Sequence, residues 1–315
     1  MMPRIRRAVF VARPCLVAAG LLFLTGCSIR QSTVDMIGDA LSGGAGVYAS
    51  DNDAELIREA LPFGLKMFES LLEASPSHQG LLLATAKGFT AYAYLLQDQA
   101  DRLETTDLAG AQRLRARARR LYVRGRDYAL RGLDRRSRGF TANLRQDRAT
   151  ALQMTQVNDV ALLYWAGAAW AGAISAAKND PYLLIDLPTA GALIARVVEL
   201  DEGYDGGAAR EFLIAFEAGR PGGSLQLARA HYQRALELSG GDKASVYLAL
   251  AEGVALREQN LAEFERLIQA ALAVDPQKHS QLRLANTIAQ QRAQWLQSRI
   301  NELFLETGPL QEKLE

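Results

Sequence analysis

The chain has 315 residues and almost balanced charge, with 36 Lys and Arg against 35 Asp and Glu, three His and two Cys. The length allows one large or two small domains with a real core, and the balance argues against a nucleic-acid partner, which would need clustered positive charge. The three histidines, His78, His231 and His279, lie far apart without a helical partner four residues on, so no metal site and no cofactor site is expected.

The first predicted element is a signal peptide over residues 1–26. Four arginines and no acidic residue precede an apolar run from Cys15 to Leu24, and the run is followed by two small residues, Thr25 and Gly26. A basic start, a short apolar core and small residues at the cleavage point are typical of secretory signals, and this core is too short for a final transmembrane helix. Leu24-Thr25-Gly26-Cys27 resembles the lipobox of bacterial lipoproteins, which implies lipidation of Cys27 and cleavage after Gly26.

Cleavage after Gly26 changes what the mature chain can do. It leaves 289 residues and lowers Lys and Arg from 36 to 32 against the same 35 acidic residues. Cys15 is removed and Cys27 carries lipid, so no cysteine is left for a disulfide, a thiolate nucleophile or a zinc site. Two or three acyl chains anchor a protein stably. In lipoproteins of this type, Ser28 after the cysteine favours the periplasmic face of the outer membrane.

Residues 27–52 are predicted to be a lipidated tether. Thr33 to Leu41 has the apolar spacing of a short helix, which Ser42-Gly43-Gly44-Ala45-Gly46 then interrupts. A glycine cluster also suggests a phosphate loop, but no strand pattern precedes it and no Lys-Ser/Thr follows. A hinge is therefore the favoured interpretation.

Residues 53–307 are predicted to be one helical repeat domain, followed by a tail over residues 308–315. Asp53 or Asn52 can cap a first helix that Ser75-Pro76-Ser77 ends, and Leu81–Leu96 forms the next. Residues 97–108 are polar and are expected to be a connection. Leu282–Phe304 is expected to be one long helix. No segment shows sustained alternation of apolar and polar residues, so essentially no sheet is expected.

The segment from Arg102 to Arg148 holds fourteen arginines and five acidic residues. At helical pitch one face is apolar and includes Gly125 and Gly132, where another helix can approach closely. A second face carries the candidate partner-binding residues Arg113, Arg117, Arg120 and Arg124. Two main interpretations remain open: a solvated face whose arginines pair with neighbouring carboxylates, or a docking surface for an acidic partner or anionic lipid headgroups. A nucleic-acid patch is the least favoured.

Val160–Ala177 has eighteen residues without a charge, close to the length of a membrane span. Its many Ala and Gly residues add little transfer energy, so a helix buried in a helical stack is favoured. The aromatic residues of this segment either pack in the core or line a groove or pore for an apolar ligand. The candidate lining residues are Tyr92, Tyr94, Tyr164, Trp165 and Trp170.

A spacing of small, large and small apolar residues recurs near the ends of four predicted helices. The copies are Gly64/Phe68/Leu71, Ala190/Ile194/Val197, Ala228/Tyr232/Ala235 and Phe264/Ile268/Ala271. The pattern resembles the second helix of a tetratricopeptide repeat, in which small residues let paired helices touch. The predicted fold is therefore all-α, an array of antiparallel helical hairpins built from divergent tetratricopeptide-like repeats that forms a curved α-solenoid.

The order of several short motifs resembles the TRAP-transporter T-component (TatT) lipoproteins. The stretches are Ser42–Gly44 with Ser50-Asp51, Glu59–Phe63, Gly80–Thr85, Tyr122–Leu133, Tyr164–Trp170, Asp180-Pro181, Val198–Asp201 with Tyr204, and Arg283–Asn286. The resemblance implies a helical, tetratricopeptide-like periplasmic lipoprotein that works with the solute-binding protein of a TRAP system. It also implies a homotrimer with a pore or groove through each protomer, which hands over ligands such as hydrophobic acids.

No motif supports catalysis. The chain lacks G-x-S-x-G, H-E-x-x-H and a cysteine–histidine pair, so an enzyme is not expected. The alternative to the TRAP role is a structural lipoprotein that scaffolds an envelope assembly, because helical repeats are general protein-binding surfaces.

Overall fold

The computed structural model describes residue 36 and residues 45–177 and 184–304, and every regular element in these parts of the chain is a helix. The expectation of an all-helical chain without sheet is confirmed for these residues. The expected signal peptide, Cys27, the helix over Thr33–Leu41, Asp180-Pro181 and the tail over residues 308–315 lie outside them. The elements are α2 (Ala45–Ala49), α3 (Ala54–Ala74), α4 (Gln79–Leu103), α5 (Leu108–Arg136), α6 (Phe140–Gln146), α7 (Arg148–Gln153), η1 (Val157–Asp159), α8 (Val160–Ser175), α10 (Leu187–Leu200), α11 (Ala208–Gly219), α12 (Leu225–Ser239), α13 (Ala244–Leu250), η2 (Ala251–Ala255), α14 (Leu261–Ala273), η3 (Ser280–Leu282), α15 (Arg283–Ser298) and α16 (Ile300–Leu303).

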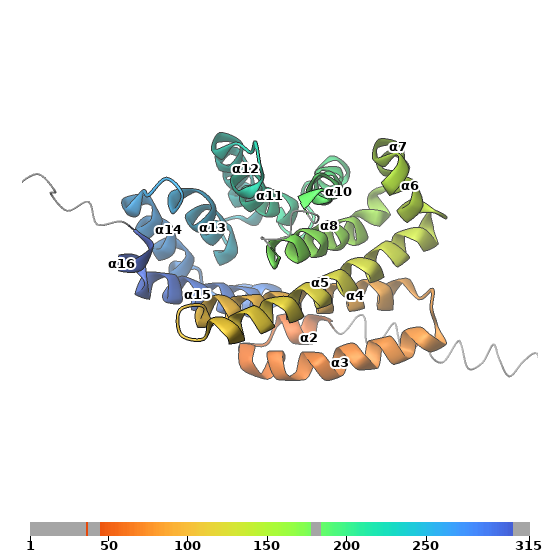
Figure 1. Ribbon diagram of the computed structural model, residues 1–315, viewed down its shortest axis with the longest axis horizontal. Helices are drawn as coiled ribbons and strands as arrows, with labels where there is room; N and C mark the ends of the chain where they lie inside the picture. The colour runs from red at the N-terminus through yellow and green to blue at the C-terminus, as the bar shows by residue number, and fades with distance from the viewer. Residues whose placement is uncertain (1–35, 37–44, 178–183, 305–315) are drawn as a thin grey trace, which may run out of the picture.

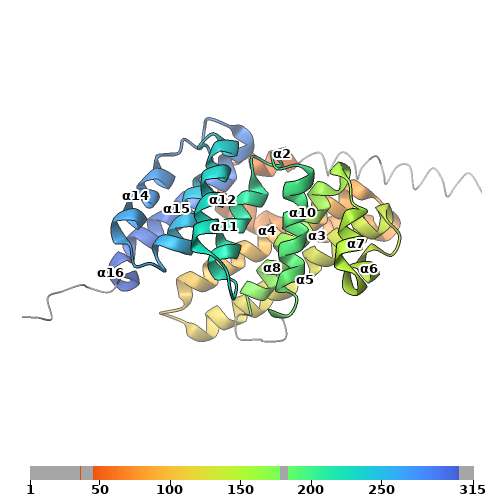
Figure 2. The same ribbon diagram turned by 90° about the horizontal axis from the view of Figure 1, so that it is seen from above.

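The helices form two packed groups (Figures 1 and 2). Helices α3 to α10 surround cores in which Phe140, Leu163 and Leu193 are completely or almost completely buried, and α11 to α16 surround a second core that includes Phe264 and Ile268. In Figure 1, α3 forms the lower edge, the long helices α4 and α5 cross the picture above it, α8, α10 and α11 lie above them, and α15 lies at their left end. Burial of these apolar side chains is the main stabilising contribution in both groups.

The first helix begins and ends where its sequence predicts. The Asp53 carboxylate accepts hydrogen bonds from the backbone N–H groups of Glu55 and Leu56, at 3.0 and 2.9 Å, which satisfies donors that have no partner inside the helix. Helix α3 ends at Ala74 and Ser75 is its C-cap. Both expected boundaries are confirmed.

Helix α4 is longer than predicted, and the expected connection over residues 97–108 is wrong for most of its length. The helix continues to Leu103, with Ala100 completely buried. The polar residues of this turn pair within and between helices: Arg102 bonds Asp98 at 2.7 Å, and Arg115 of α5 bonds Asp101 and Glu104 at 3.0 and 2.8 Å. Their polarity therefore reflects ion pairs between helices and not a loop.

The glycines on the apolar face of α5 allow close helix packing, as expected. A Cβ atom on Gly125 would lie 3.0 Å from the Ala86 carbonyl oxygen and 2.7 Å from the Thr90 hydroxyl of α4. A Cβ atom on Gly132 would lie 2.7 Å from a methyl group of Leu162 in α8. Helix α5 can therefore pack against both α4 and α8 with small separations.

The charge-free segment from Val160 is helix α8, which is buried in the stack as expected, with Leu163 and Ala166 completely inaccessible. Within the parts of the chain that the structure describes, none of the helices has the length and apolar character needed to span a membrane.

The recurring apolar spacing is buried in three of its four copies. In α10, α12 and α14 all three positions are buried, whereas in α3 only Gly64 is buried and Phe68 and Leu71 are half-buried.

The expected single helix over Leu282–Phe304 is wrong: the segment is divided into η3, α15 and α16, with a break at Arg299. The break turns Phe304 back onto Phe264, where the ring centroids lie 5.0 Å apart.

Candidate functional site

Helices α4 and α8 run side by side in the same direction. The Lys87 ammonium lies 5.7 Å from the centre of the Trp165 ring, and ten residues later in both helices Gln97 Nε2 donates to Ser175 Oγ at 3.2 Å. The equal offset means that the two helices stay in step over about 15 Å, at 1.5 Å per residue. Between these two levels the exposed side of α4 carries Ala91 and Tyr94.

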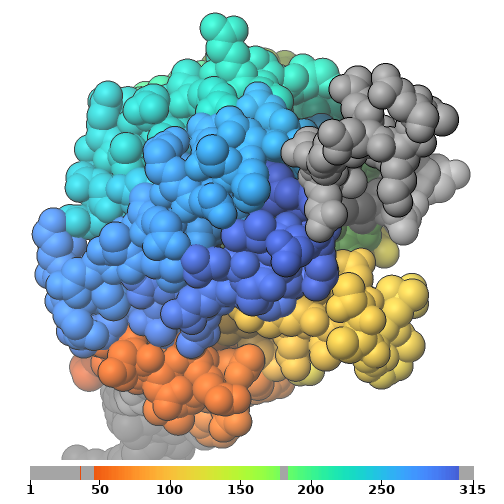
Figure 3. Space-filling view, turned by 90° about the vertical axis from the view of Figure 1, so that its left-hand side faces the viewer, coloured from red at the N-terminus to blue at the C-terminus, as the bar shows by residue number. Residues whose placement is uncertain are grey.

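Tyr94 lies on the exposed side of α4. Its side chain is 45% exposed, yet burial raises the pKa of its hydroxyl well above the ordinary value, and the Glu252 carboxylate raises it further. We use the name central hollow for the region that α4 and α8 border on one side and α11, η2 and α15 on the other. Figure 3 shows the end of the molecule nearest this region, with the C-terminal helices in blue, α2 and α3 in orange below them and the yellow end of α4 and α5 beside them.

An aromatic cluster forms one wall of the central hollow. Tyr164 lies edge-on to Trp165 with ring centroids 5.2 Å apart, and 5.5 Å from Tyr204. Burial raises the pKa of Tyr164, and the Glu211 carboxylate, which also acts on Tyr94, raises it further.

The carboxylates around the hollow have cationic partners from the opposite helices. Lys243, which is 8% exposed, bonds Glu211 at 3.3 Å and donates to the Asp205 carbonyl oxygen at 2.8 Å. Asp205 itself has φ of +47°, an unusual backbone conformation for a non-glycine residue. This turn thus holds Tyr204 against α8.

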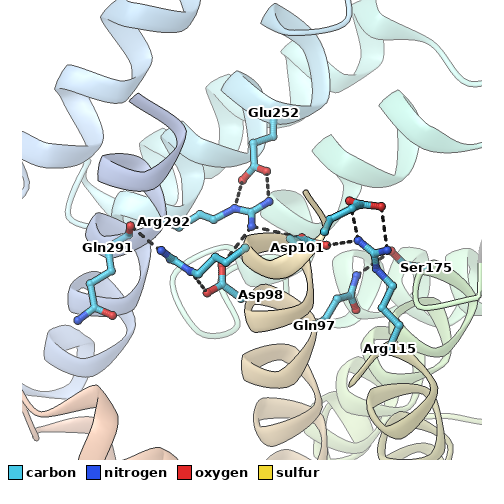
Figure 4. Close-up of polar contacts among 10 residues, drawn as sticks. Gln97, Asp98, Asp101, Arg115, Ser175, Glu252, Gln291 and Arg292 are labelled. Carbon is cyan, nitrogen blue, oxygen red and sulfur yellow. Dashed lines mark hydrogen bonds and ion pairs between the residues drawn. The ribbon is translucent and has the colours of Figure 1, made fainter. Parts of the chain in front are cut away.

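Arg292 connects α15 to α4 across one end of the hollow (Figure 4). Its guanidinium bonds Glu252 of η2 at 2.7 Å, Asp98 at 3.1 Å and Asp101 at 3.2 Å. Burial alone would lower the pKa of Arg292, but the Glu252 carboxylate, followed by Tyr94 and Asp101, raises it above its ordinary value. Arg102 continues the network by bonding Asp98 and the Gln291 carbonyl oxygen. These contacts hold the two helix groups together.

The structure brings together three of the five aromatic residues predicted to line a groove and places two elsewhere. Tyr94, Tyr164 and Trp165 border the central hollow. Tyr92 is 8% exposed and packs under Arg117, which donates to its hydroxyl at 3.2 Å. Trp170 is 7% exposed, donates to Asp186 at 3.3 Å and lies under the Arg126 guanidinium.

The four candidate arginines of α5 differ in what they contact. Arg113 is 74% exposed, and its nearest carboxylate, that of Asp107, is 3.8 Å away. Arg120 is exposed and makes no ion pair with any described residue. Arg117 stacks on Tyr92. Arg124 bonds Glu69 at 2.5 Å and lies 4.8 Å from the Phe89 ring centre.

Glu69 organises the end of this face nearest α3. It is 8% exposed and accepts bonds from Lys66 at 2.8 Å and the Tyr128 hydroxyl at 2.8 Å, besides Arg124. Burial would raise the pKa of Glu69, but the hydrogen bonds and the Arg124 charge hold it below its ordinary value. Arg124 is therefore committed to the fold, whereas Arg113 and Arg120 are open to a partner.

Lys87 and Arg292 are residues of this region that the sequence analysis did not name, and Tyr204 was named there only as part of a family motif. Lys87 is a single cation inside an otherwise charge-free segment of α4, and this isolation is the feature of the sequence that could have pointed to it.

The three histidines are far apart in the structure as well: His78 caps α4, His231 lies 3.1 Å from Arg210, and His279 bonds Asp242 at 2.8 Å. Among the described residues no three His, Cys, Asp or Glu side chains are grouped to hold a metal ion.

The family model for the TRAP transporter T-component matches residues 50–304, which include every helix described above except α2. The chain belongs to the TRAP transporter T-component family. Members of this family are non-catalytic accessory components of TRAP transporters. A protein of Treponema pallidum (strain Nichols), described as uncharacterized, is 26% identical over 314 residues, which cover 93% of this chain and 97% of that relative.

Proposed function

We propose that this T-component protein is a lipid-anchored accessory of a TRAP-type uptake system, which binds the system's periplasmic solute-binding protein and passes a ligand through its central hollow. Membership of the family is the observation that supports the association with a TRAP system. The hollow supports the ligand role, because three aromatic rings, Tyr94, Tyr164 and Trp165, border it together with a cation, Lys87.

The proposed partner-binding surface is the exposed part of the arginine face, comprising Arg113, Arg117 and Arg120. Their side chains are held by few carboxylates of this chain, so an acidic surface of a partner could approach them. Charges of this kind raise association rates and define the docking orientation more than they add affinity.

We further propose that the helices form a divergent tetratricopeptide-like solenoid, and that the protein assembles as a homotrimer.

The proposed anchor is the acylated Cys27, on the periplasmic face of the outer membrane. Changing Cys27→Ser is expected to leave an unlipidated precursor from which the signal peptide is not removed. Metabolic labelling with a radioactive fatty acid and the size of the mature band measure this. Normal acylation and processing of the variant would contradict the anchor.

The whole proposal is tested by in-cell crosslinking, purification of the protein from envelopes, and identification of the bound proteins and small molecules. The expected partner is a solute-binding protein encoded beside a TRAP permease. Recovery of envelope assembly proteins in its place, with no such gene neighbour in related genomes, would favour the scaffold function.

A further inference from the structure

We propose that the end of the molecule where α5 meets α6 and α7 lies against the anionic phospholipid headgroups of the membrane that carries the protein. Both Figure 1 and Figure 2 place α6 and α7 at the end opposite α14 and α16. The inference rests on the proposed function only for the acyl anchor. We call this surface the basic end, and its exposed arginines are Arg135, Arg138, Arg145 and Arg148.

The first observation is that the positive charge of the basic end has no counterion in the chain. None of its four arginines forms an ion pair with a described residue. Arg148 has a neutral partner, the Thr189 hydroxyl, to which it donates at 3.3 Å. These guanidinium groups therefore remain available to anions outside the molecule, unlike Arg124, which is bonded to Glu69.

The carboxylates of the same segment are engaged locally. Asp134 accepts hydrogen bonds from the backbone N–H and the hydroxyl of Thr141 at 2.8 and 2.7 Å. Asp147 does the same for Thr150, at 3.1 and 2.6 Å, and so caps α7. Residues 131–148 contain six arginines and these two aspartates. A local excess of positive charge attracts anions even though the expected mature chain is slightly acidic.

The second observation is exposed apolar surface beside the arginines. Met154, which follows α7, is 56% exposed, and Val157, the first residue of η1, is 59% exposed. Arg136 and Asp159 approach to 3.6 Å and hold η1 beside the end of α5. Basic side chains together with exposed apolar ones are typical of surfaces that bind the headgroup region of a bilayer. This combination favours phospholipid over an acidic protein.

The proposed anchor brings the basic end to the membrane without fixing its orientation. Seventeen residues separate Cys27 from Ala45, the first residue of α2, and a fully extended chain of this length spans up to about 60 Å. The acyl chains therefore allow any face to approach the bilayer. Guanidinium groups bind phosphate oxygens in pairs, and each arginine near an anionic surface strengthens the attraction about fivefold. The basic end would thus select one orientation.

The test measures the distance of each end from the bilayer by fluorescence energy transfer. The full mature protein with its anchor is placed in vesicles of phosphatidylcholine, or of phosphatidylcholine with roughly 30% phosphatidylglycerol, with a headgroup-labelled acceptor lipid. A donor dye is attached at Ala149→Cys on α7 or, as the matched control, at Ala262→Cys on α14, both exposed positions. At about 50 mM salt, phosphatidylglycerol is expected to raise transfer from position 149 at least about twofold and to leave position 262 without a rise. The rise should disappear at about 0.5 M salt.

Two charge-reversed variants locate the contact. Arg138→Glu combined with Arg145→Glu is expected to remove most of the rise at position 149, whereas Arg257→Glu combined with Arg266→Glu, two exposed arginines of the other helix group, should keep it. Circular dichroism melting verifies that both variants are folded. Equal transfer from position 149 in the two kinds of vesicle would overturn the proposal and would leave these arginines to an acidic protein or to solvent.

A failure of the anchor can be told apart from a failure of this contact. Reaction of the dye with the wild type, which has no introduced cysteine, would show that Cys27 is not acylated. The lipid contact is then measured by flotation of the same protein with the two kinds of vesicle. Recovery that is no greater with phosphatidylglycerol would overturn the contact, and greater recovery, lost in the Arg138→Glu and Arg145→Glu variant, would support it.

Discussion

The Arg292 network and the wall at Lys87 border the same hollow but treat a positive charge in opposite ways. Arg292 is surrounded by Glu252, Asp98 and Asp101, all between 2.7 and 3.2 Å from its guanidinium nitrogens. Lys87 has only an aromatic ring beneath it and no carboxylate within ion-pair distance among the described residues. The first cation completes an internal network, and the second has no carboxylate of the described residues beside it.

The arginine face of α5 repeats this contrast on the outer surface. Arg124 is paired with Glu69 and stacked on Phe89, whereas Arg113 and Arg120 extend toward solvent. The density of charge along α5 therefore does not separate the arginines that stabilise the fold from those that are open to a partner. What separates them is whether each charge already has a partner in the same chain.

Removing Arg292 should have the largest effect on stability. Arg292→Met leaves three carboxylates facing one another without a cation, so we expect the free energy of unfolding to fall by about 3 kcal/mol. Urea denaturation followed by circular dichroism measures the change. Arg266→Met is the matched control, since Arg266 is 63% exposed and its ion pair with Glu263 spans 3.5 Å, and it should change stability by less than about 0.5 kcal/mol. Equal stability of the two variants would mean that the network does not hold the helix groups together.

A variant at Glu69 provides a second test of whether a paired charge stabilises the fold, here between α3 and α5. Glu69→Gln removes the negative charge that Arg124 and Lys66 share, and should lower the free energy of unfolding by about 1 kcal/mol near neutral pH. Glu73→Gln, four residues further along α3 and exposed, is the control and should have little effect.

The pH dependence of stability gives a second measurement on Glu69. Its pKa is lower in the folded state than in the unfolded state, so its stabilising contribution is complete above its ordinary pKa and is lost as the pH falls through its folded value. Glu69→Gln should therefore differ from the wild type near neutral pH and converge with it on acidification. A difference that is independent of pH would assign the effect to packing.

The sequence predicted those parts of the fold that depend on local signals. The Asp53 cap, the end of α3 at Ser75 and the close approach at Gly125 follow from short-range hydrogen bonding and from the absence of a side chain. The end of α4 and the break at Arg299 depend on distant partners, namely Arg115 and Phe264. A sequence pattern does not show which distant residue will pair with a polar side chain or pack against an apolar one.

The candidate site shows the same limit. Helical pitch places Tyr92 and Tyr94 on different sides of α4, and the structure buries the first and exposes the second to the hollow. Lys87 could not be recognised as unpaired from the sequence, because the lack of a partner is a property of the packed molecule. The aromatic candidates therefore follow from the sequence, whereas Lys87, the cation on the Trp165 ring, was found only in the structure.

Charge reversal on the exposed part of the arginine face should weaken partner binding without unfolding the protein. Arg117→Glu combined with Arg120→Glu is expected to lower the affinity for the solute-binding protein about tenfold, mainly through slower association. Surface plasmon resonance at two salt concentrations measures this, and the effect should shrink at high salt. Arg266→Glu on α14 is the control. Unchanged binding by the double variant would return these arginines to the role of a solvated helix face.

Lys87→Met should have the smallest effect on stability, and of the opposite sign to Arg292→Met. Because Lys87 has no counterion among the described residues, its replacement by an apolar side chain removes a desolvation cost, and the free energy of unfolding should stay the same or rise by up to about 1 kcal/mol. The same urea denaturation measures it, so the two methionine variants compare a paired with an unpaired cation directly. If Lys87→Met destabilised the protein as much as Arg292→Met, Lys87 would be a structural cation, and the two sides of the hollow would no longer differ.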